Sequence, residues 1–230
     1  MAPATLFAPS PRNCQTIAID TRLRYNAGVE IERITLDQEP EGFTWFAKPA
    51  HFSFGNGLTL HTEPLTDFWQ RTHYGIRRDT GHALLRRFSE SFTLTTEVTY
   101  EPTSQYDQCG VFVRTDAANW LKASVEYEGD EPSHLGSVVT TLGYSDWAWQ
   151  DIDASVRTLS YRVSKRESDI LVEWTRDGNP WTSIRIAHLH AQGEEVEAGI
   201  YACSPVGEGF DCRFSYIEFG PCEWNATPPM

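Results

Sequence analysis

Apolar and polar residues alternate along most of the chain after residue 43. Successive side chains of a β-strand point to opposite faces, so this period of two predicts strands with one apolar face each. Gly, Pro, Asn or Asp closes most of these segments, and a helical period is almost absent. The pattern predicts strands over residues 57–61, 92–100, 108–115, 120–128, 137–142, 159–165, 169–176, 181–186, 195–203 and 211–219.

Many short strands joined by turns, such as Arg176-Asp177-Gly178-Asn179, predict an all-β, two-sheet antiparallel sandwich of the concanavalin A-like, jelly-roll kind. We place the sandwich at residues 43–220. Residues 1–42, rich in proline and lacking a long period, form a partly irregular N-terminal arm in which residues 29–36 could make a strand. Residues 221–230 form a C-terminal tail.

The alternation also predicts which side chains face the other sheet. Leu121, Ala123 and Val125 point inward, whereas the opposite face of the same strand carries an indole, an ammonium and carboxylates from Trp120, Lys122, Glu126 and Glu128. In the preceding strand, the inward set is Cys109, Val111 and Val113, and the outward set is Gln108, Phe112 and Arg114. A plain sandwich needs no such groups on its outer face, which predicts a ligand cleft on the concave sheet face.

Composition narrows the classes of partner. A formal net charge of −13 opposes binding to nucleic-acid phosphates. No apolar run approaches the roughly 18 residues that would span a bilayer, and no export signal is visible, so we predict a cytoplasmic protein without membrane contact. Five cysteines without tight pairing favour reduced thiols, although Cys203 and Cys212 could face each other across a hairpin.

Four segments carry a family resemblance. They are Asp67-Phe-Trp-Gln-Arg-Thr-His-Tyr-Gly75, Tyr106-Asp-Gln-Cys-Gly-Val-Phe-Val-Arg114, Trp120-Leu-Lys-Ala-Ser-Val-Glu-Tyr127, and Val138-Val139-Thr140 with Ser145-Asp146-Trp147. In this order they resemble the concanavalin A-like family of unassigned function that includes the yeast regulator-of-enolase protein and small bacterial homologues from pectin-degradation gene clusters. The resemblance covers residues 43–220 and implies a jelly roll without implying a reaction.

The first functional hypothesis is the binding of a small saccharide on the concave face. Indole and phenol rings stack on the C–H side of a pyranose, and amides and charged groups bind its hydroxyls. The ring candidates are Trp69, Tyr74, Trp120 and Trp147, and the polar candidates are Asp107, Gln108 and Lys122. Lys122 would orient a carboxylate or phosphate on the sugar; the alternative is a structural ion pair with Asp107 or Glu126. Trp120 is expected to be a ligand platform and not a core residue.

The second hypothesis gives the same face a catalytic step, as a glycoside hydrolase, lyase or sugar isomerase. Glu126 would act as base or nucleophile, with Asp146, Lys122 or His73 as the proton partner. Glu126 and Glu128, two residues apart on one strand, would place their carboxyls about 5 to 7 Å apart, as glycosidases do. The third hypothesis is a regulatory domain that binds a metabolic protein partner.

No cofactor is predicted. His188 and His190 have the spacing of two metal ligands on one strand face, but no third ligand is obvious, so we predict a surface pair and no metal site.

Overall fold

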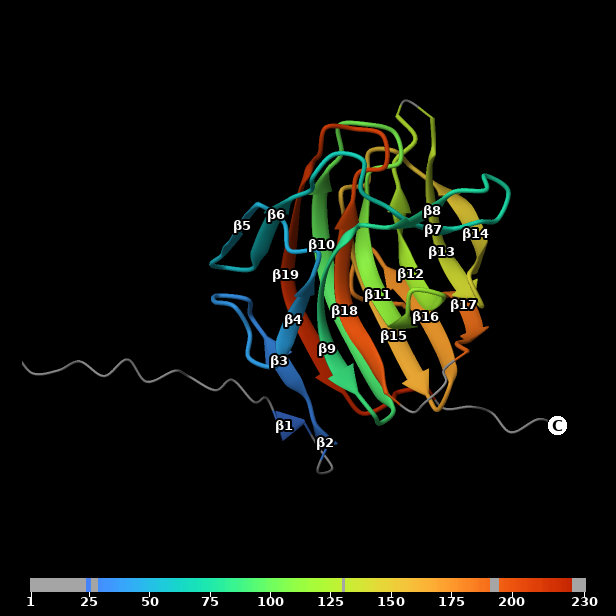
Figure 1. The fold of residues 1–230 in the computed structure, drawn as a ribbon. Helices are drawn as coiled ribbons and strands as arrows, with labels where there is room; N and C mark the ends of the chain where they lie inside the picture. Colours follow the sequence, from blue (N-terminus) through green and yellow to red (C-terminus); the bar gives the residue numbers. More distant parts are fainter. Residues whose placement is uncertain (1–23, 26–28, 130, 191–194, 225–230) are drawn as a thin grey trace, which may run out of the picture.

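The computed structural model describes residues 24–25, 29–129, 131–190 and 195–224, and all of its regular elements are strands. Two large antiparallel sheets pack face to face (Figure 1). The predicted all-β sandwich is therefore confirmed. Among the described residues, no helix has the length and apolar character needed to cross a membrane.

One sheet has seven strands in the order β14-β13-β12-β11-β18-β9-β4. In that order, the strands span Tyr144–Ile152, Ser133–Thr141, Asn119–Glu126, Gln108–Asp116, Val196–Cys203, His82–Phe88 and Phe43–Phe46.

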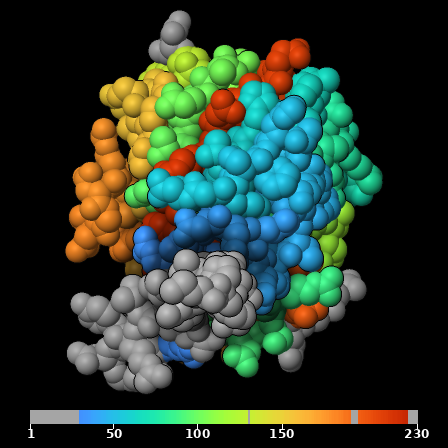
Figure 2. Space-filling model, turned by 90° about the vertical axis from the view of Figure 1, so that its left-hand side faces the viewer, coloured from blue at the N-terminus to red at the C-terminus, as the bar shows by residue number. Residues whose placement is uncertain are grey.

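The other sheet has eight strands, with β3 beside β19 and the rest in the order β17-β16-β15-β10-β19-β6-β5. From β17 to β5 they span Thr182–His188, Asp169–Thr175, Thr158–Arg166, Phe92–Glu101, Asp211–Gly220, Leu58–His61 and His51–Phe54, and β3 spans Glu32–Ile34. The segment from β3 to β6, blue in Figure 2, covers one side of the molecule, where β4 and β5 form sheet edges.

The main core lies between the two sheets, and its members confirm the predicted inward faces. Leu121, Ala123 and Val125 of β12 are fully buried there, as are the alternate residues of β11. All ten predicted strands are present. The alternation missed β9, because residues 82–85 of this strand are buried on both faces and lack a period of two. It also missed β14, an edge strand with mostly exposed side chains.

A short hairpin lies over the other face of the seven-stranded sheet. It consists of β7 (Phe68–Gln70), β8 (Arg77–Asp79) and the turn between them, and it crosses in front of the central strands (Figure 1). A further pair, β1 (Arg24–Tyr25) and β2 (Val29–Glu30), lies near the start of the chain. We call the sheet face under the β7–β8 hairpin the pocket face.

Trp120 lies in a second apolar core between this hairpin and the sheet. Its ring centroid is 6.1 Å from Phe68 of the hairpin and 5.7 Å from Phe112 of β11, and the residue is 0% exposed. The predicted strand face is correct, but the expectation that Trp120 is a ligand platform is wrong. Alternation assigns a side chain to a face and cannot show that a distant hairpin covers that face.

The N-terminal boundary of the sandwich needs a correction as well. β3 pairs with β19 through Ile34 and Ile217, and Leu36 is buried in the main core. The sandwich therefore includes residues before Phe43, the start that the sequence pattern predicts.

The cysteines also differ from one expectation. Cys109, Cys203, Cys212 and Cys222 are free thiols, whereas Cys14 lies outside the described residues. Cys203 ends β18 in the seven-stranded sheet and Cys212 lies on β19 in the other sheet. The two cysteines therefore do not face each other across a hairpin.

Candidate functional site

Lys122 places a buried ammonium under the β7–β8 hairpin. The residue is 2% exposed, and its Nζ donates to Oδ1 of Asp67 over 3.3 Å. An ammonium has three donors, so two of them lack a hydrogen-bond partner among the described residues. Burial lowers the pKa of Lys122, but the carboxylates of Asp67 and Glu126 outweigh burial and keep the pKa above its ordinary value. Lys122 is therefore charged, and its ammonium can donate further hydrogen bonds.

Asp67 stands where the chain enters the hairpin. Its Oδ1 also accepts the backbone N–H of Phe68 at 2.7 Å, and its carbonyl accepts the N–H groups of Thr80 and Gly81. These bonds fix the carboxylate above Lys122. The pairing partner is neither Asp107 nor Glu126, the two partners considered from the sequence.

Glu126 lies four residues beyond Lys122, on the same face of β12. Its Oε2 accepts a hydrogen bond of 2.7 Å from Nε2 of Gln108, the residue opposite it on β11. Burial raises the pKa of Glu126 to about 7, an effect that Lys122 and Gln108 only partly offset. The carboxyl is thus poised to gain or lose a proton near neutral pH.

These polar groups form the floor of a pocket of about 290 Å³. The floor consists of Asp67, Gln108, Lys122 and Glu126, and the walls carry four aromatic rings, from Trp69, Tyr74, Tyr106 and Trp147. Trp69 and Tyr74 meet edge to face at 5.4 Å, and the indole N–H of Trp69 donates to the carbonyl of Thr72. Five of the predicted ligand-binding residues therefore come together: Trp69, Tyr74, Gln108, Lys122 and Trp147.

Asp107 does not contribute its side chain to the pocket. Its Oδ2 accepts the backbone N–H groups of Thr103 and Ser104, each at 2.9 Å, and its Oδ1 accepts the hydroxyl of Ser204. Asp107 therefore stabilises the turn before β11. In this turn, Tyr106 adopts a left-handed backbone with φ of 71°, and its ring lines the pocket. The predicted ligand-binding role of Asp107 is replaced by a structural one.

Two of the predicted proton partners of Glu126 lie outside the pocket. Asp146 pairs in register with Val139, on the core face of the sheet, and its Oδ1 contacts Nη2 of Arg185 at 2.5 Å. His73 is exposed at the hairpin turn, where its ring meets the ring of Tyr74 edge to face at 4.7 Å. Neither residue lines the pocket with Glu126.

Several lining residues were missed by sequence reasoning. Asp67 and Tyr106 begin two of the segments that carry the family resemblance, but no local pattern says that their side chains meet over β12. The rim of the pocket includes Ile76, Arg78, Pro205 and Val206, which come from the hairpin and from the segment after β18. Only the tertiary arrangement brings these segments together.

Glu126, Glu128 and His134 form a potential metal-ligand cluster at the end of the pocket. One ligand atom of each lies within 4.8 Å of the others. Nδ1 of His134 contacts Oε1 of Glu128 at 3.1 Å, and Gln105 donates to Oε2 of Glu128 at 2.7 Å. Glu128 does not line the pocket, so the two glutamates do not flank a bound sugar as a glycosidase pair.

The predicted surface pair of histidines, His188 and His190, lies more than fifty residues after His134 in the sequence. His188 is exposed and its Nδ1 contacts Oδ1 of Asp169 at 2.9 Å.

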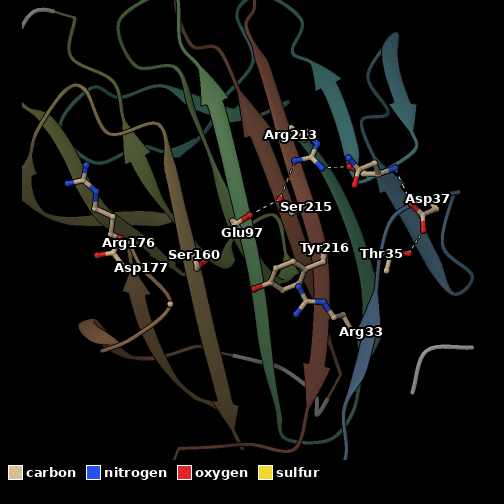
Figure 3. Close-up of a pocket in the computed structure, with 12 residues that line it drawn as sticks. Arg33, Thr35, Asp37, Glu97, Ser160, Arg176, Asp177, Arg213, Ser215 and Tyr216 are labelled. Carbon is tan, nitrogen blue, oxygen red and sulfur yellow. Dashed lines mark hydrogen bonds between the residues drawn. The ribbon is translucent and has the colours of Figure 1, made fainter. Parts of the chain in front are cut away.

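A larger hollow of about 680 Å³ lies on the eight-stranded sheet (Figure 3). Its side chains bond mainly to one another: Ser215 donates to Glu97 at 2.8 Å, Arg213 donates to the carbonyl of Asn56, and Arg33 stacks on Tyr216. None of the sequence-predicted site residues lines it. Because none of the sequence-predicted site residues lines this hollow and many of its polar groups are paired with one another, we place the candidate site in the pocket around Lys122.

The family model described as "Protein of unknown function (DUF1349)" matches residues 45–222. The chain belongs to this family. It is also 34% identical to "Regulation of enolase protein 1" of Saccharomyces cerevisiae over 188 residues, which are 81% of this chain and 90% of the relative. The predicted family relationship is thus confirmed.

The fold of this DUF1349 chain also resembles the folds of solved structures. A functionally unknown protein from Saccharomyces cerevisiae, 32% identical, superposes with a TM-score of 0.69 over 82% of this chain and 97% of that one. The GH43 protein BlXynB from Bacillus licheniformis gives a TM-score of 0.64 at 15% identity, over 81% of this chain and 38% of that one. At that identity, the likeness to BlXynB shows the fold alone.

Proposed function

We propose that this protein binds a small saccharide in the pocket around Lys122. The observation that carries the proposal is a buried ammonium with unused donors, set beside two carboxyls and under aromatic walls. Lys122 makes one hydrogen bond to the described residues, so its ammonium can also donate to the hydroxyl groups of a ligand. The pocket volume of about 290 Å³ suits a ligand of monosaccharide size.

The pocket offers both kinds of surface that a sugar presents. Lys122 donates to hydroxyl oxygens, whereas Asp67 and Glu126 accept from hydroxyl hydrogens. Trp69 and Trp147 supply apolar ring faces for C–H groups. Since the walls and the floor come from the β7–β8 hairpin, β11, β12, β14 and the turn before β11, a sugar ring would be held from several elements at once.

Isothermal titration calorimetry with D-xylose, D-glucose, D-galacturonic acid and glucose 6-phosphate tests the proposal. We expect saturable binding of at least one of them, and we expect Trp147→Ala to weaken that binding about tenfold through the loss of a stacking surface. Trp181→Ala, which removes an indole remote from the pocket, is the control and should bind as the wild type does. Absence of binding across the panel would remove the saccharide proposal.

Catalysis in the same pocket is the second candidate function, and the pKa of Glu126 favours it. A carboxyl with a pKa of about 7 can both donate and accept a proton at neutral pH, as hydrolase, lyase and isomerase reactions require. Because Asp146 and His73 lie elsewhere, the proton partners in the pocket include Lys122, Asp67, Tyr74 and Tyr106.

Glu126→Gln separates binding from catalysis. If the protein is an enzyme, this variant should keep its saccharide affinity within a few-fold and lose turnover by about 10² to 10⁴, because it keeps an amide-sized side chain and loses the titrating proton. Product formation is followed by NMR with the saccharide that binds. Turnover equal to that of the wild type would exclude Glu126 from the reaction.

Regulation of a metabolic enzyme is a third candidate function, and its support is the relationship to the yeast protein. The name of the yeast relative concerns regulation of enolase, and regulation need not exclude a sugar pocket. A protein partner and the cytoplasmic location stay predictions from the sequence.

A further inference from the structure

A shallow trough of about 10 Å³ adjoins the pocket on the pocket face, and it shares Gln108, Lys122, Glu126, Val138 and Trp147 with the pocket. A row of residues with small side chains, Gly110, Ser124 and Gly136, crosses β11, β12 and β13 in register. Lys122, Val138 and Trp147 border the row on one side, and Gln108, Glu126 and His134 border it on the other. The small side chains therefore leave a floor between two walls.

The trough has a buried aromatic ring at one end, which we call the closed end, and an exposed aromatic ring at the other, the open end. At the β18 end, Tyr201 stands opposite Gly110, and its buried hydroxyl bonds to Ser124 at 2.7 Å. At the β14 end, Gly136 stands opposite Trp149. β14 is the edge strand of its sheet, so no further strand of that sheet borders the trough on that side.

Trp149 marks the open end with an exposed ring. The residue is 51% exposed, and its indole stacks on Trp147 with a centroid distance of 4.2 Å and an interplanar angle of 26°. Trp147 lines the pocket, so the two indoles form a continuous apolar path from the pocket to the sheet edge. A side chain at position 136 would collide with this path, because a Cβ there would lie 2.9 Å from the Cβ of Trp149. An exposed indole beside a pocket is typical of a site that makes a second contact with an extended ligand.

We propose that Trp149 is a second sugar subsite, so that the protein recognises the end of an oligosaccharide and not only a single sugar. This rests on the proposed function. The terminal unit occupies the closed pocket over Lys122 and Glu126, and the next unit leaves through the open end and stacks on the exposed face of Trp149. Tyr201 at the closed end is buried and offers no surface to a further sugar unit, so the proposal predicts binding to chain ends.

Calorimetry with matched sugars tests the subsite. The probes are D-xylose with xylobiose, D-glucose with cellobiose, and D-galacturonic acid with digalacturonic acid. For the sugar that binds, we expect the disaccharide to bind about three- to tenfold more tightly than the monosaccharide. Trp149→Ala should abolish that gain, so that the disaccharide binds this variant no more tightly than the monosaccharide does, and Trp181→Ala should leave both affinities unchanged.

The outcomes separate the two proposals. If a monosaccharide binds and Trp149→Ala leaves the disaccharide affinity unchanged, the second subsite is overturned and the pocket stands. A disaccharide that binds no better than its monosaccharide overturns the second subsite in the same way. If no probe of either length binds to the wild type, the proposed function fails, and the second subsite fails with it.

Discussion

Replacing Trp120 by alanine is expected to lower the free energy of unfolding by about 3 to 5 kcal/mol, because it opens a cavity in the second core under the β7–β8 hairpin. Trp120 packs there against Phe68 and Phe112 and has no exposed surface. For a chain of this size, the loss corresponds to a fall in melting temperature of roughly 10 °C. Urea denaturation and differential scanning calorimetry measure both quantities.

Trp149→Ala is the matched control for this prediction. It removes the same side chain from the same sheet face, but from an exposed position, so we expect a loss of about 1 kcal/mol or less. Trp120→Phe should fall between the two: the indole N–H of Trp120 has no hydrogen-bond partner among the described residues, so only packing is lost. Equal and small losses for Trp120→Ala and Trp149→Ala would contradict the second core.

Replacing Glu126 by glutamine is expected to make the protein more stable than the wild type above pH 7. The ordinary pKa of 4.5 applies to the unfolded chain, and burial raises the folded pKa to about 7. Between these two values, the unfolded state has released the proton and the folded state has kept it. Stability from this group is therefore full below about pH 4.5, declines as the pH rises to 7, and stays low above it. The penalty is on the order of 3 kcal/mol, and glutamine does not incur it.

The measurement is the free energy of unfolding of both proteins in urea at pH 5, 6, 7 and 8. The difference, variant minus wild type, should grow across this range and level off above pH 7. Glu101→Gln, at an exposed position at the end of β10, is the control. Parallel curves for Glu126→Gln and the wild type would show that Glu126 is hydrated in the folded protein, and the case for acid–base chemistry at this residue would be lost.

The β7–β8 hairpin links both predictions to the proposed function. Through Phe68 it covers Trp120, and through Asp67 it contacts Lys122 in the pocket. The same cover that makes Trp120 structural gives Lys122 and Glu126 the burial on which their electrostatics depend. Substitutions in this hairpin should therefore be interpreted with stability and binding measured together.

Alternation of apolar and polar residues was enough to predict the sandwich and the two faces of its central strands. Period-two alternation in β11 and β12 is a local property of the chain, and it placed Leu121 and Val125 in the main core and Lys122 and Glu126 on the other face. The same reasoning supplied most of the polar floor and three of the four wall rings, because these residues sit on strands or within the segments that carry the family resemblance.

What covers the pocket face, in contrast, depends on contacts between segments that are distant in the sequence. The hairpin reaches β12 from more than fifty residues away and pairs Asp67 with Lys122, a contact that no local pattern encodes. It also turns Trp120 from an expected ligand platform into a core residue. Asp146 was misplaced for a related reason: β14 went unrecognised as a strand, so its alternation could not be used to put Asp146 on the core face, apart from Trp147. Periodicity fixes the direction of a side chain, whereas burial and pairing depend on segments that fold onto it from elsewhere in the chain.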